Sequence, residues 1–353
     1  MPIYKHHIAL LGGGTIGLSM TALHLRRPDT RVTIYDPRPD FESQVRSTLP
    51  AFIHPNENGN ETDKEKETIV DALLSTTQLT IAKTIQEAVQ NATIIQEQSP
   101  EQTASKQALW KEVARYTSRD AHLWSSSSGI AASAQGALCS PDVVERLLVA
   151  HPFNPPHVMP LVEIVPGPGT NPERVEFVKS YFAGVPGPSL VPGSEAGPGS
   201  GSASQQEQYY RPIVLHKEIA GFVGNRLAFA LLREACYLVG EGVVSVKDLD
   251  ALIMASLGPR WAGSGVFESY HAGGGEGGIA AFLQKLAPTM KDVWGGLGQV
   301  DISVGKEDAT ETEWREAVVR QAEEAYGPSV TPEERQKKEV MLKGVIEMQN
   351  KFL

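Results

Sequence analysis

The chain has 353 residues, of which 41% are apolar and 21% charged, so it can bury one large or two ordinary hydrophobic cores. Its 42 acidic residues exceed its 32 lysines and arginines, and a net charge of −10 disfavours nucleic acid as a partner because phosphate contacts need a basic face. No apolar run reaches the ~20 residues of a membrane span, and the stretch before the first strand-like run is too short for a targeting signal. Two cysteines cannot form a disulfide framework or a zinc site. We therefore expect a cytoplasmic protein with no membrane, nucleic-acid or metal partner.

The first 40 residues predict a strand, a glycine-rich turn, a helix and a second strand. An apolar run at 7–11 is typical of a buried strand, glycines occupy 12–14, and apolar residues recur over 16–25 as in a buried helix. A second strand-like run at 31–35 ends at Asp36. This succession opens a parallel sheet with helices on its faces.

The turn has the spacing Gly12-x-Gly14-x-x-Gly17, which favours binding of a dinucleotide. Gly12 would make the tight turn, Gly14 would let a pyrophosphate approach the backbone, and Gly17 would let the helix pack closely on the strand. Thr15 and Ile16, between the last two glycines, complete the candidate cofactor-binding residues of this turn. A glycine-rich turn without a ligand is the alternative interpretation.

Asp36 predicts which dinucleotide is bound. An acidic side chain at the end of the second strand can accept hydrogen bonds from both ribose hydroxyls of NAD, and it repels the 2′-phosphate of NADP. The nearby Arg38 would offset part of that repulsion. We expect NAD as the cofactor.

The remaining sequence predicts two domains. Strand-like and helix-like runs alternate up to residue 165, as in a doubly wound α/β fold, whereas helical spacing of apolar residues dominates after Lys217. Residues 186–208 are mostly proline, glycine, serine and glutamine, which is typical of a flexible insertion. We expect a Rossmann-type NAD-binding domain over 1–212 and an all-helical domain over 213–353.

A histidine and a glutamate, His151 and Glu163, stand twelve residues apart, and the glutamate lies within the apolar run LVEIV. A carboxylate in such a strand is costly unless it is paired, and a histidine is the obvious partner. In such a pair one ring nitrogen donates to the acid while the other exchanges a proton with a substrate. A purely structural pair is the alternative.

Three further polar sites have a structural as well as a functional interpretation. The serine run 125–128 follows a strand-like segment, so it forms either a polar turn or a hydroxyl at the ligand-binding edge of the sheet. Asn225 either caps the helix that follows or binds substrate. Arg260, in a predicted turn at 258–261, either binds a substrate carboxylate through its planar guanidinium or serves as a helix cap or dimer contact.

Several motifs together point to a known family. They are LLGGGTIG at 10–17, QEQSPEQTASK at 96–106, SSSSGI at 125–130, HPFNPPHVMPLVEIV at 151–165, KEIAGFVGNRL at 217–227, EGVVSVKDLDALI at 241–253 and GPRW at 258–261. With these motifs the chain resembles the 3-hydroxyacyl-CoA dehydrogenase family, and more closely its branch of lambda-crystallin and L-gulonate 3-dehydrogenase. Nearly the whole chain except 186–208 is covered by the resemblance.

The resemblance implies functional roles for the residues at matching positions. These are His151 as catalytic base, Glu163 as its paired acid, Ser128 and Asn225 as further catalytic residues, Asn154 beside the substrate, and Glu101 and Lys106 near the cofactor. Ser127 rivals Ser128, because the interval from serine to histidine is longer than the family pattern predicts. The resemblance also implies that the helical domain binds substrate and forms a homodimer.

The reaction implied is NAD-dependent oxidation of a secondary alcohol β to a carboxyl or acyl carbonyl group. We expect a free 3-hydroxy acid such as L-gulonate, with Arg260 binding its carboxylate, because the first domain shows no basic cluster for the phosphates of CoA. A 3-hydroxyacyl-CoA thioester and a carnitine-like substrate are alternatives of the same class. A non-catalytic NAD-binding or structural protein is the alternative of another class, and the intact set of catalytic residues argues against it.

Overall fold

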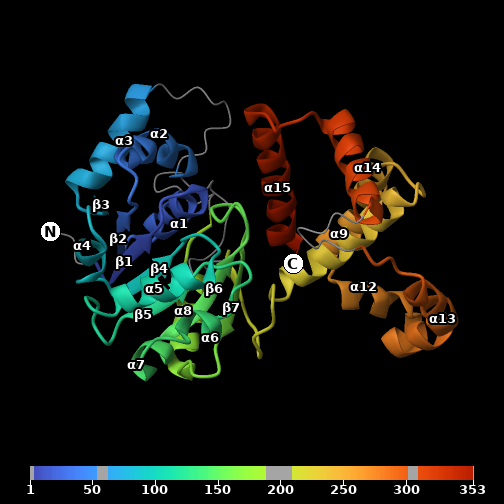
Figure 1. Ribbon diagram of the computed structural model, residues 1–353, viewed down its shortest axis with the longest axis horizontal. Helices are drawn as coiled ribbons and strands as arrows, with labels where there is room; N and C mark the ends of the chain where they lie inside the picture. Colours follow the sequence, from blue (N-terminus) through green and yellow to red (C-terminus); the bar gives the residue numbers. More distant parts are fainter. Residues whose placement is uncertain (1–3, 54–62, 188–208, 301–308, 353) are drawn as a thin grey trace, which may run out of the picture. The chain divides into compact units, whose positions relative to one another are not determined.

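The computed structural model describes residues 4–53, 63–187, 209–300 and 309–352, and Figure 1 shows the course of the chain. The chain forms two compact units, Met1–Val223 and Gly224–Leu353. All but the first two residues of the insertion predicted at 186–208 lie outside the described residues. Among the described residues, no helix is long and apolar enough to cross a membrane.

An eight-stranded sheet forms the centre of the first unit. Its strands lie in the order β3-β2-β1-β4-β5-β6-β7-β8, and every neighbouring pair is parallel except β6 and β7. The strands are β1 (His6–Leu11), β2 (Thr30–Tyr35), β3 (Leu79–Ile81), β4 (Ile94–Glu97), β5 (His122–Ser125), β6 (Leu147–Pro152), β7 (Leu161–Pro166) and β8 (Arg211–Val214). The order reverses between β1 and β4, and in such sheets ligands bind at the carboxyl ends of the strands beside that switch.

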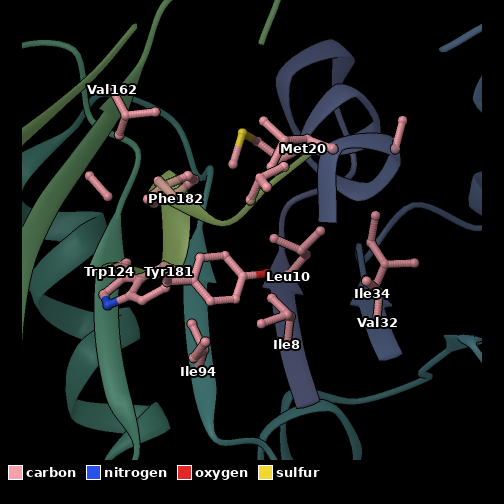
Figure 2. Packing of buried hydrophobic residues seen from close by; sticks show 14 of the residues in the cluster. Ile8, Leu10, Met20, Val32, Ile34, Ile94, Trp124, Val162, Tyr181 and Phe182 are labelled. Carbon is pink, nitrogen blue, oxygen red and sulfur yellow. The ribbon is translucent and has the colours of Figure 1, made fainter. Parts of the chain in front are cut away.

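Both faces of this sheet are apolar and covered, because successive residues of a central strand point to opposite faces. Ile8 and Leu10 of β1 pack in one buried cluster, and Ala9 and Leu11 pack in another. Figure 2 shows the first cluster, in which side chains from the strands meet side chains from α1 and α8. The helices of this unit are α1 (Thr15–Leu25), α2 (Phe41–Ile53), α3 (Asp63–Ser75), α4 (Ile85–Val89), α5 (Thr103–Val113), α6 (Ala132–Gly136), α7 (Pro141–Val144) and α8 (Pro172–Ala183). The doubly wound α/β class predicted for the N-terminal part is confirmed.

The second unit is helical and has no strand among its described residues, as predicted. Its helices are α9 (Gly224–Gly240), α10 (Val246–Ala255), α11 (Leu257–Gly263), α12 (Val266–Gly273), α13 (Gly278–Gly295), α14 (Ala309–Tyr326) and α15 (Pro332–Phe352), with a 3₁₀ turn at Gly275–Gly277. Few of the described side chains are buried: α10, α11 and α12 have no buried residue, and apolar side chains such as Phe229 and Phe267 are exposed. Exposed apolar surface of this kind is typical of an interaction face.

The first unit extends beyond the boundary predicted after residue 212. β8 runs to Val214 and pairs in parallel with β7, and Phe222 is fully buried in the second apolar cluster of the sheet. The N–H group of Val223 donates a hydrogen bond to Glu163 of β7. These contacts tie the connecting segment to the sheet, so the two units divide after Val223.

Candidate active site

The glycine-rich turn connects β1 to α1. Gly12 has φ +106°, and a Cβ there would stand 2.8 Å from a carbonyl oxygen of the loop after β4, so only glycine fits. A Cβ on Gly17 would stand 2.0 Å from the Gly12 carbonyl oxygen, so α1 packs closely on the turn. Gly14 has open space where a Cβ would be, and no side chain caps the helix at its start. The first N–H groups of α1, including those of Thr15 and Ile16, therefore suit an anion such as a pyrophosphate.

The carboxylate of Asp36 stands beside this turn, directly after β2. Its Oδ2 atom accepts a hydrogen bond from the Gly13 N–H group at 2.8 Å, and its two oxygens accept bonds from the Arg38 guanidinium at 2.6 and 2.9 Å. Burial raises the pKa of Asp36, but the hydrogen bonds from Arg38 and Gly13 outweigh it and hold the pKa below its ordinary value. Asp36 is thus ionised at neutral pH, and Arg38 offsets part of its charge.

His151 of β6 stands directly opposite Glu163 of β7 in the antiparallel register. The His151 Nδ1 atom lies 2.9 Å from Glu163 Oε2, and the side chains are only 6% and 3% exposed. Because a carboxylate only accepts hydrogen bonds, Nδ1 carries the donated proton and Nε2 is the accepting nitrogen of the neutral ring. The rings of Phe153 and Phe222 lie against the imidazole, with centroids at 5.0 and 5.6 Å. The pair therefore has the arrangement of a histidine base oriented by an acid.

The loop after β5 gives Ser127 and Ser128 different surroundings. The Ser127 hydroxyl is buried, donates to the Glu101 carboxylate at 2.9 Å and accepts the Ile130 N–H group at 2.8 Å. Ser128 donates its own N–H group to the same carboxylate, while the residue is exposed. Ser127 thus stabilises the loop, whereas Ser128 is the exposed serine of the run 125–128.

Sequence reasoning missed a residue that organises this loop, Glu97 at the end of β4. Its fully buried carboxylate accepts hydrogen bonds from Ser125, from Ser99 and from Lys106 Nζ, the last at 2.8 and 2.9 Å. The Lys106 side chain is 1% exposed, and its Nζ atom lies 3.5 Å from Glu101. The Lys106 ammonium is therefore enclosed between two acids. A glutamate two residues after the apolar run ATII is the sequence signal for this pair, because a buried carboxylate needs a cation.

Three predicted residues lie outside the strands. Asn154 is exposed in the loop after β6, Asn225 is partly buried as the second residue of α9, and Arg260 is exposed in α11. The turn predicted at 258–261 is wrong, because Pro259 stands in the first turn of a helix, where its missing N–H group costs no hydrogen bond. Asn225 and Arg260 belong to the second unit. In the described parts of the chain, no three His, Cys, Asp or Glu side chains are grouped so as to hold a metal ion.

The candidate residues of the first unit share one edge of the sheet. Gly12, Asp36, Glu97 and Ser125 end or directly follow β1, β2, β4 and β5, and His151 lies near the end of β6. Since these strands are parallel, their carboxyl ends lie along the same edge, which includes the switch between β1 and β4. One edge thus carries a turn suited to a pyrophosphate, an acid suited to a ribose and a buried His–Glu pair, which is the set of groups that a dinucleotide-dependent dehydrogenase requires.

Comparison with known proteins identifies the same class. Residues 7–191 match the family described as "3-hydroxyacyl-CoA dehydrogenase, NAD binding domain", and residues 221–293 match "3-hydroxyacyl-CoA dehydrogenase, C-terminal domain". The chain belongs to the 3-hydroxyacyl-CoA dehydrogenase family. It is an NAD-dependent oxidoreductase that acts on CH–OH groups.

Relatives with different substrates are similar to most of the chain. An L-carnitine dehydrogenase of Mesorhizobium japonicum is 33% identical over 83% of this chain and 71% of its own. A 3-hydroxyacyl-CoA dehydrogenase of Gibberella moniliformis is 32% identical over 80% of this chain and 78% of its own. Among solved structures, that of FHMPC 5-dehydrogenase, an NAD⁺-dependent dismutase, has the same fold, with a TM-score of 0.63, 24% identity and 98% of each chain covered.

Proposed function

We propose that this protein oxidises the secondary hydroxyl group of a free 3-hydroxy acid, such as L-gulonate, to the 3-oxo acid. The buried pair of His151 and Glu163 carries the proposal, because it supplies a base at the edge of the sheet that also holds the glycine-rich turn. Family membership supports the NAD-dependent oxidation of a CH–OH group. The choice of a free acid rests on Arg260 as a partner for its carboxylate.

His151 acts as the general base. Since its Nδ1–H group is held by Glu163, its Nε2 atom accepts the proton of the substrate hydroxyl while the carbon loses hydride. Glu163 keeps the ring in one orientation and stabilises the imidazolium that forms. General-base assistance of this kind contributes ~10²–10⁴-fold to the rate. In the reverse direction, the same nitrogen returns the proton to the carbonyl oxygen.

The first unit holds the cofactor through the groups around the glycine-rich turn. NAD, when bound, supplies the acceptor of the hydride. The N–H groups at the start of α1, next to Gly14, would bind its pyrophosphate, and the Asp36 carboxylate would accept hydrogen bonds from its ribose hydroxyls. The Glu101 carboxylate accepts hydrogen bonds from Ser127 and Ser128 at the same edge of the sheet. Lys106 stabilises this site from the protein interior, since its Nζ atom is enclosed by Glu97 and Glu101.

Four polar side chains orient the substrate in this proposal. Ser128, Asn154 and Asn225 offer hydrogen bonds, and the planar guanidinium of Arg260 matches the two oxygens of a carboxylate. L-carnitine is a second candidate substrate, favoured by the L-carnitine dehydrogenases that are 33% and 32% identical to this chain. L-gulonate and L-carnitine are both 3-hydroxy carboxylates, so they would use the same base and the same carboxylate contact.

Turnover of the purified protein with NAD and a panel of three substrates tests the substrate class. We expect kcat/KM for L-gulonate or L-carnitine to exceed that for 3-hydroxybutyryl-CoA by at least tenfold, about 1.4 kcal/mol. A kcat/KM for 3-hydroxybutyryl-CoA above those of both free acids would contradict the carboxylate contact and favour a thioester substrate. The ratio between the two free acids decides which of them is the better substrate.

We further propose that the protein is a cytoplasmic homodimer formed through its helical unit. Phe229, Phe267 and Trp294, from α9, α12 and α13, are 61%, 79% and 66% exposed, and apolar surface of this extent is stabilised when a second copy covers it. Cys139 and Cys236 are both free, which suits a reducing compartment. Light scattering should give a molar mass of twice 38.2 kDa, and a monomeric mass at micromolar concentration would contradict the dimer.

A further inference from the structure

In the described residues, the two non-glycine residues with positive φ are Thr77 at +57° and Phe222 at +52°. A side chain makes this left-handed conformation unfavourable, so it persists where the surroundings impose it. Thr77 is exposed after α3, and its N–H group bonds to the Leu74 carbonyl oxygen. Phe222 is instead fully buried, and its ring lies against His151. The same backbone strain thus occurs once at a surface turn and once at the candidate active site.

The chain reaches Phe222 through a tight turn. The Phe222 N–H group donates to the Ile219 carbonyl oxygen at 3.0 Å, and Gly221, the third residue of the turn, has φ +74°, as a type II turn requires. Two consecutive left-handed residues therefore lie between β8 and α9. After them, the N–H group of Val223 donates to Glu163 Oε1 at 3.0 Å.

This hydrogen bond occupies the glutamate oxygen that the histidine does not use. Oε2 of Glu163 lies at hydrogen-bonding distance from His151 Nδ1, and Oε1 accepts from Val223, so both ends of the carboxylate are held. The Phe222 ring also contacts the imidazole, with a centroid distance of 5.6 Å and an angle of 52° between the ring planes. One residue is therefore connected to both members of the pair, through the backbone that follows it and through its ring.

We propose that Phe222 is a positioning residue for the reaction: its left-handed backbone directs the Val223 N–H group to Glu163, and its ring holds the imidazole of His151. The inference rests on the proposed role of His151 as the base. Phe222 has no polar side-chain atom, so it transfers no proton and acts only through the pair. Displacing a reacting group by 1 Å can cost about 10²-fold in rate, so the orientation of the pair is a physical reason for a strained residue at this place.

Glycine variants at the two strained positions test the inference, with Thr77 as the matched control. Phe222→Gly releases the strain and removes the ring. Thr77→Gly releases the same strain just before β3, the strand at the far end of the strand order from β6 and β7. We expect kcat of Phe222→Gly to fall by about 10²-fold, with KM and the Kd for NADH within about threefold of wild type. Thr77→Gly should keep the wild-type kcat. Phe222→Leu, which retains buried apolar volume without the planar ring, should lie between them.

Removal of the Val223 N–H group alone tests the hydrogen bond to Glu163. Replacing Val223 by its α-hydroxy acid turns one amide into an ester and leaves every side chain unchanged. We expect kcat of this full-length protein to fall by about tenfold, with KM unchanged. Wild-type kcat in the ester variant would overturn the part of the inference that concerns the backbone.

The outcomes separate this inference from the proposed function. If Phe222→Gly keeps kcat within twofold of wild type while His151→Gln is inactive, the inference is overturned and the proposed base is retained. If His151→Gln itself keeps the wild-type kcat, the proposed function fails and the inference fails with it. Thermal unfolding and NADH binding show whether Phe222→Gly folds. If it does not fold, the kcat values of Phe222→Leu and the ester variant decide, and values within twofold of wild type overturn the inference.

Discussion

The two units of this chain differ in how completely they bury their own apolar surface. In the first unit, two apolar clusters enclose the sheet, and charged groups buried with them, such as Glu97 and Lys106, pair with each other. In the second unit, α10, α11 and α12 have no buried residue. The first unit therefore fixes the geometry of its polar groups by its own packing, whereas the second offers apolar surface to a further contact. The proposed base and cofactor groups lie in the first unit, and Arg260 lies in the second.

Breaking the buried ion pair should give the largest loss of stability. Lys106→Met leaves the Glu97 carboxylate buried without a cation, so the free energy of unfolding should fall by about 3–5 kcal/mol. Lys343→Met is the matched control in the second unit, where the lysine pairs with Glu339 on one face of α15, and it should cost less than about 1 kcal/mol. Chemical denaturation followed by circular dichroism measures both. The double variant Glu97→Gln/Lys106→Met should recover part of the lost free energy of unfolding, because it also removes the buried charge. Equal losses in the single and double variants would contradict the explanation that an unpaired Glu97 carboxylate causes the loss.

A second prediction concerns the pH dependence of the first unit. His24 of α1 is fully buried between Tyr181 and Gln96, and burial lowers its pKa from 6.5 to about 4. The unfolded chain binds a proton at this histidine near pH 6.5 and the folded chain only near pH 4, so the free energy of unfolding falls as the pH falls between these values. The expected loss is about 3 kcal/mol. Unfolding curves of wild type and His24→Gln between pH 7 and 4 measure it, and identical pH dependence in the two proteins would refute the assignment.

In the second unit, Arg260→Met tests whether an exposed side chain binds the substrate carboxylate. Arg260 is exposed, so its loss should leave the melting temperature unchanged. If the guanidinium binds the substrate carboxylate, KM for a free hydroxy acid should rise tenfold or more, about 1.4 kcal/mol, with the Kd for NADH unchanged. Steady-state kinetics with the free acid and with 3-hydroxybutyryl-CoA provide the measurement. An unchanged KM for the free acid would remove Arg260 from the substrate site.

The smallest expected effect concerns the choice between NAD and NADP. In the proposed role of Asp36, its carboxylate accepts hydrogen bonds from the ribose hydroxyls and repels a 2′-phosphate. Asp36→Asn removes that charge, so the preference for NAD should narrow by roughly fivefold, about 1 kcal/mol. Arg38 already neutralises part of the Asp36 charge, which limits the effect. The ratio of the Kd values for NADH and NADPH measures it in each protein. A wild-type protein that binds NADPH more tightly than NADH would contradict the role given to Asp36.

Features that depend on neighbouring residues could be predicted from the sequence. The glycine spacing, the periodicity of the first strands and helices and the position of Asp36 are local, and they sufficed for the α/β fold and for the cofactor. His151 and Glu163 were predicted as a pair because a carboxylate in an apolar strand requires a partner. The two residues stand directly opposite each other on β6 and β7, as such a pair requires.

Features that arise when distant segments meet could not be predicted in this way. Glu97 contacts Ser125, 28 residues further along the chain, because the two residues stand opposite each other in the register of β4 and β5, and Lys106 of α5 binds the same carboxylate. The left-handed backbone of Phe222 has no local signal, because phenylalanine disfavours it and only the surrounding packing imposes it. The helix at Arg260 was missed because glycine and proline at 258 and 259 suggested a turn, whereas proline is compatible with the first turn of a helix.

The proposed function depends above all on His151 removing the proton of the substrate hydroxyl. The most direct test is the single-turnover rate of NADH formation by wild type and by His151→Gln at saturating NAD and hydroxy acid, because this rate excludes product release. We expect a fall of at least 10²-fold in the variant, with the Kd for NADH unchanged. A variant that keeps even a tenth of the wild-type rate would contradict the assignment of His151 as the base.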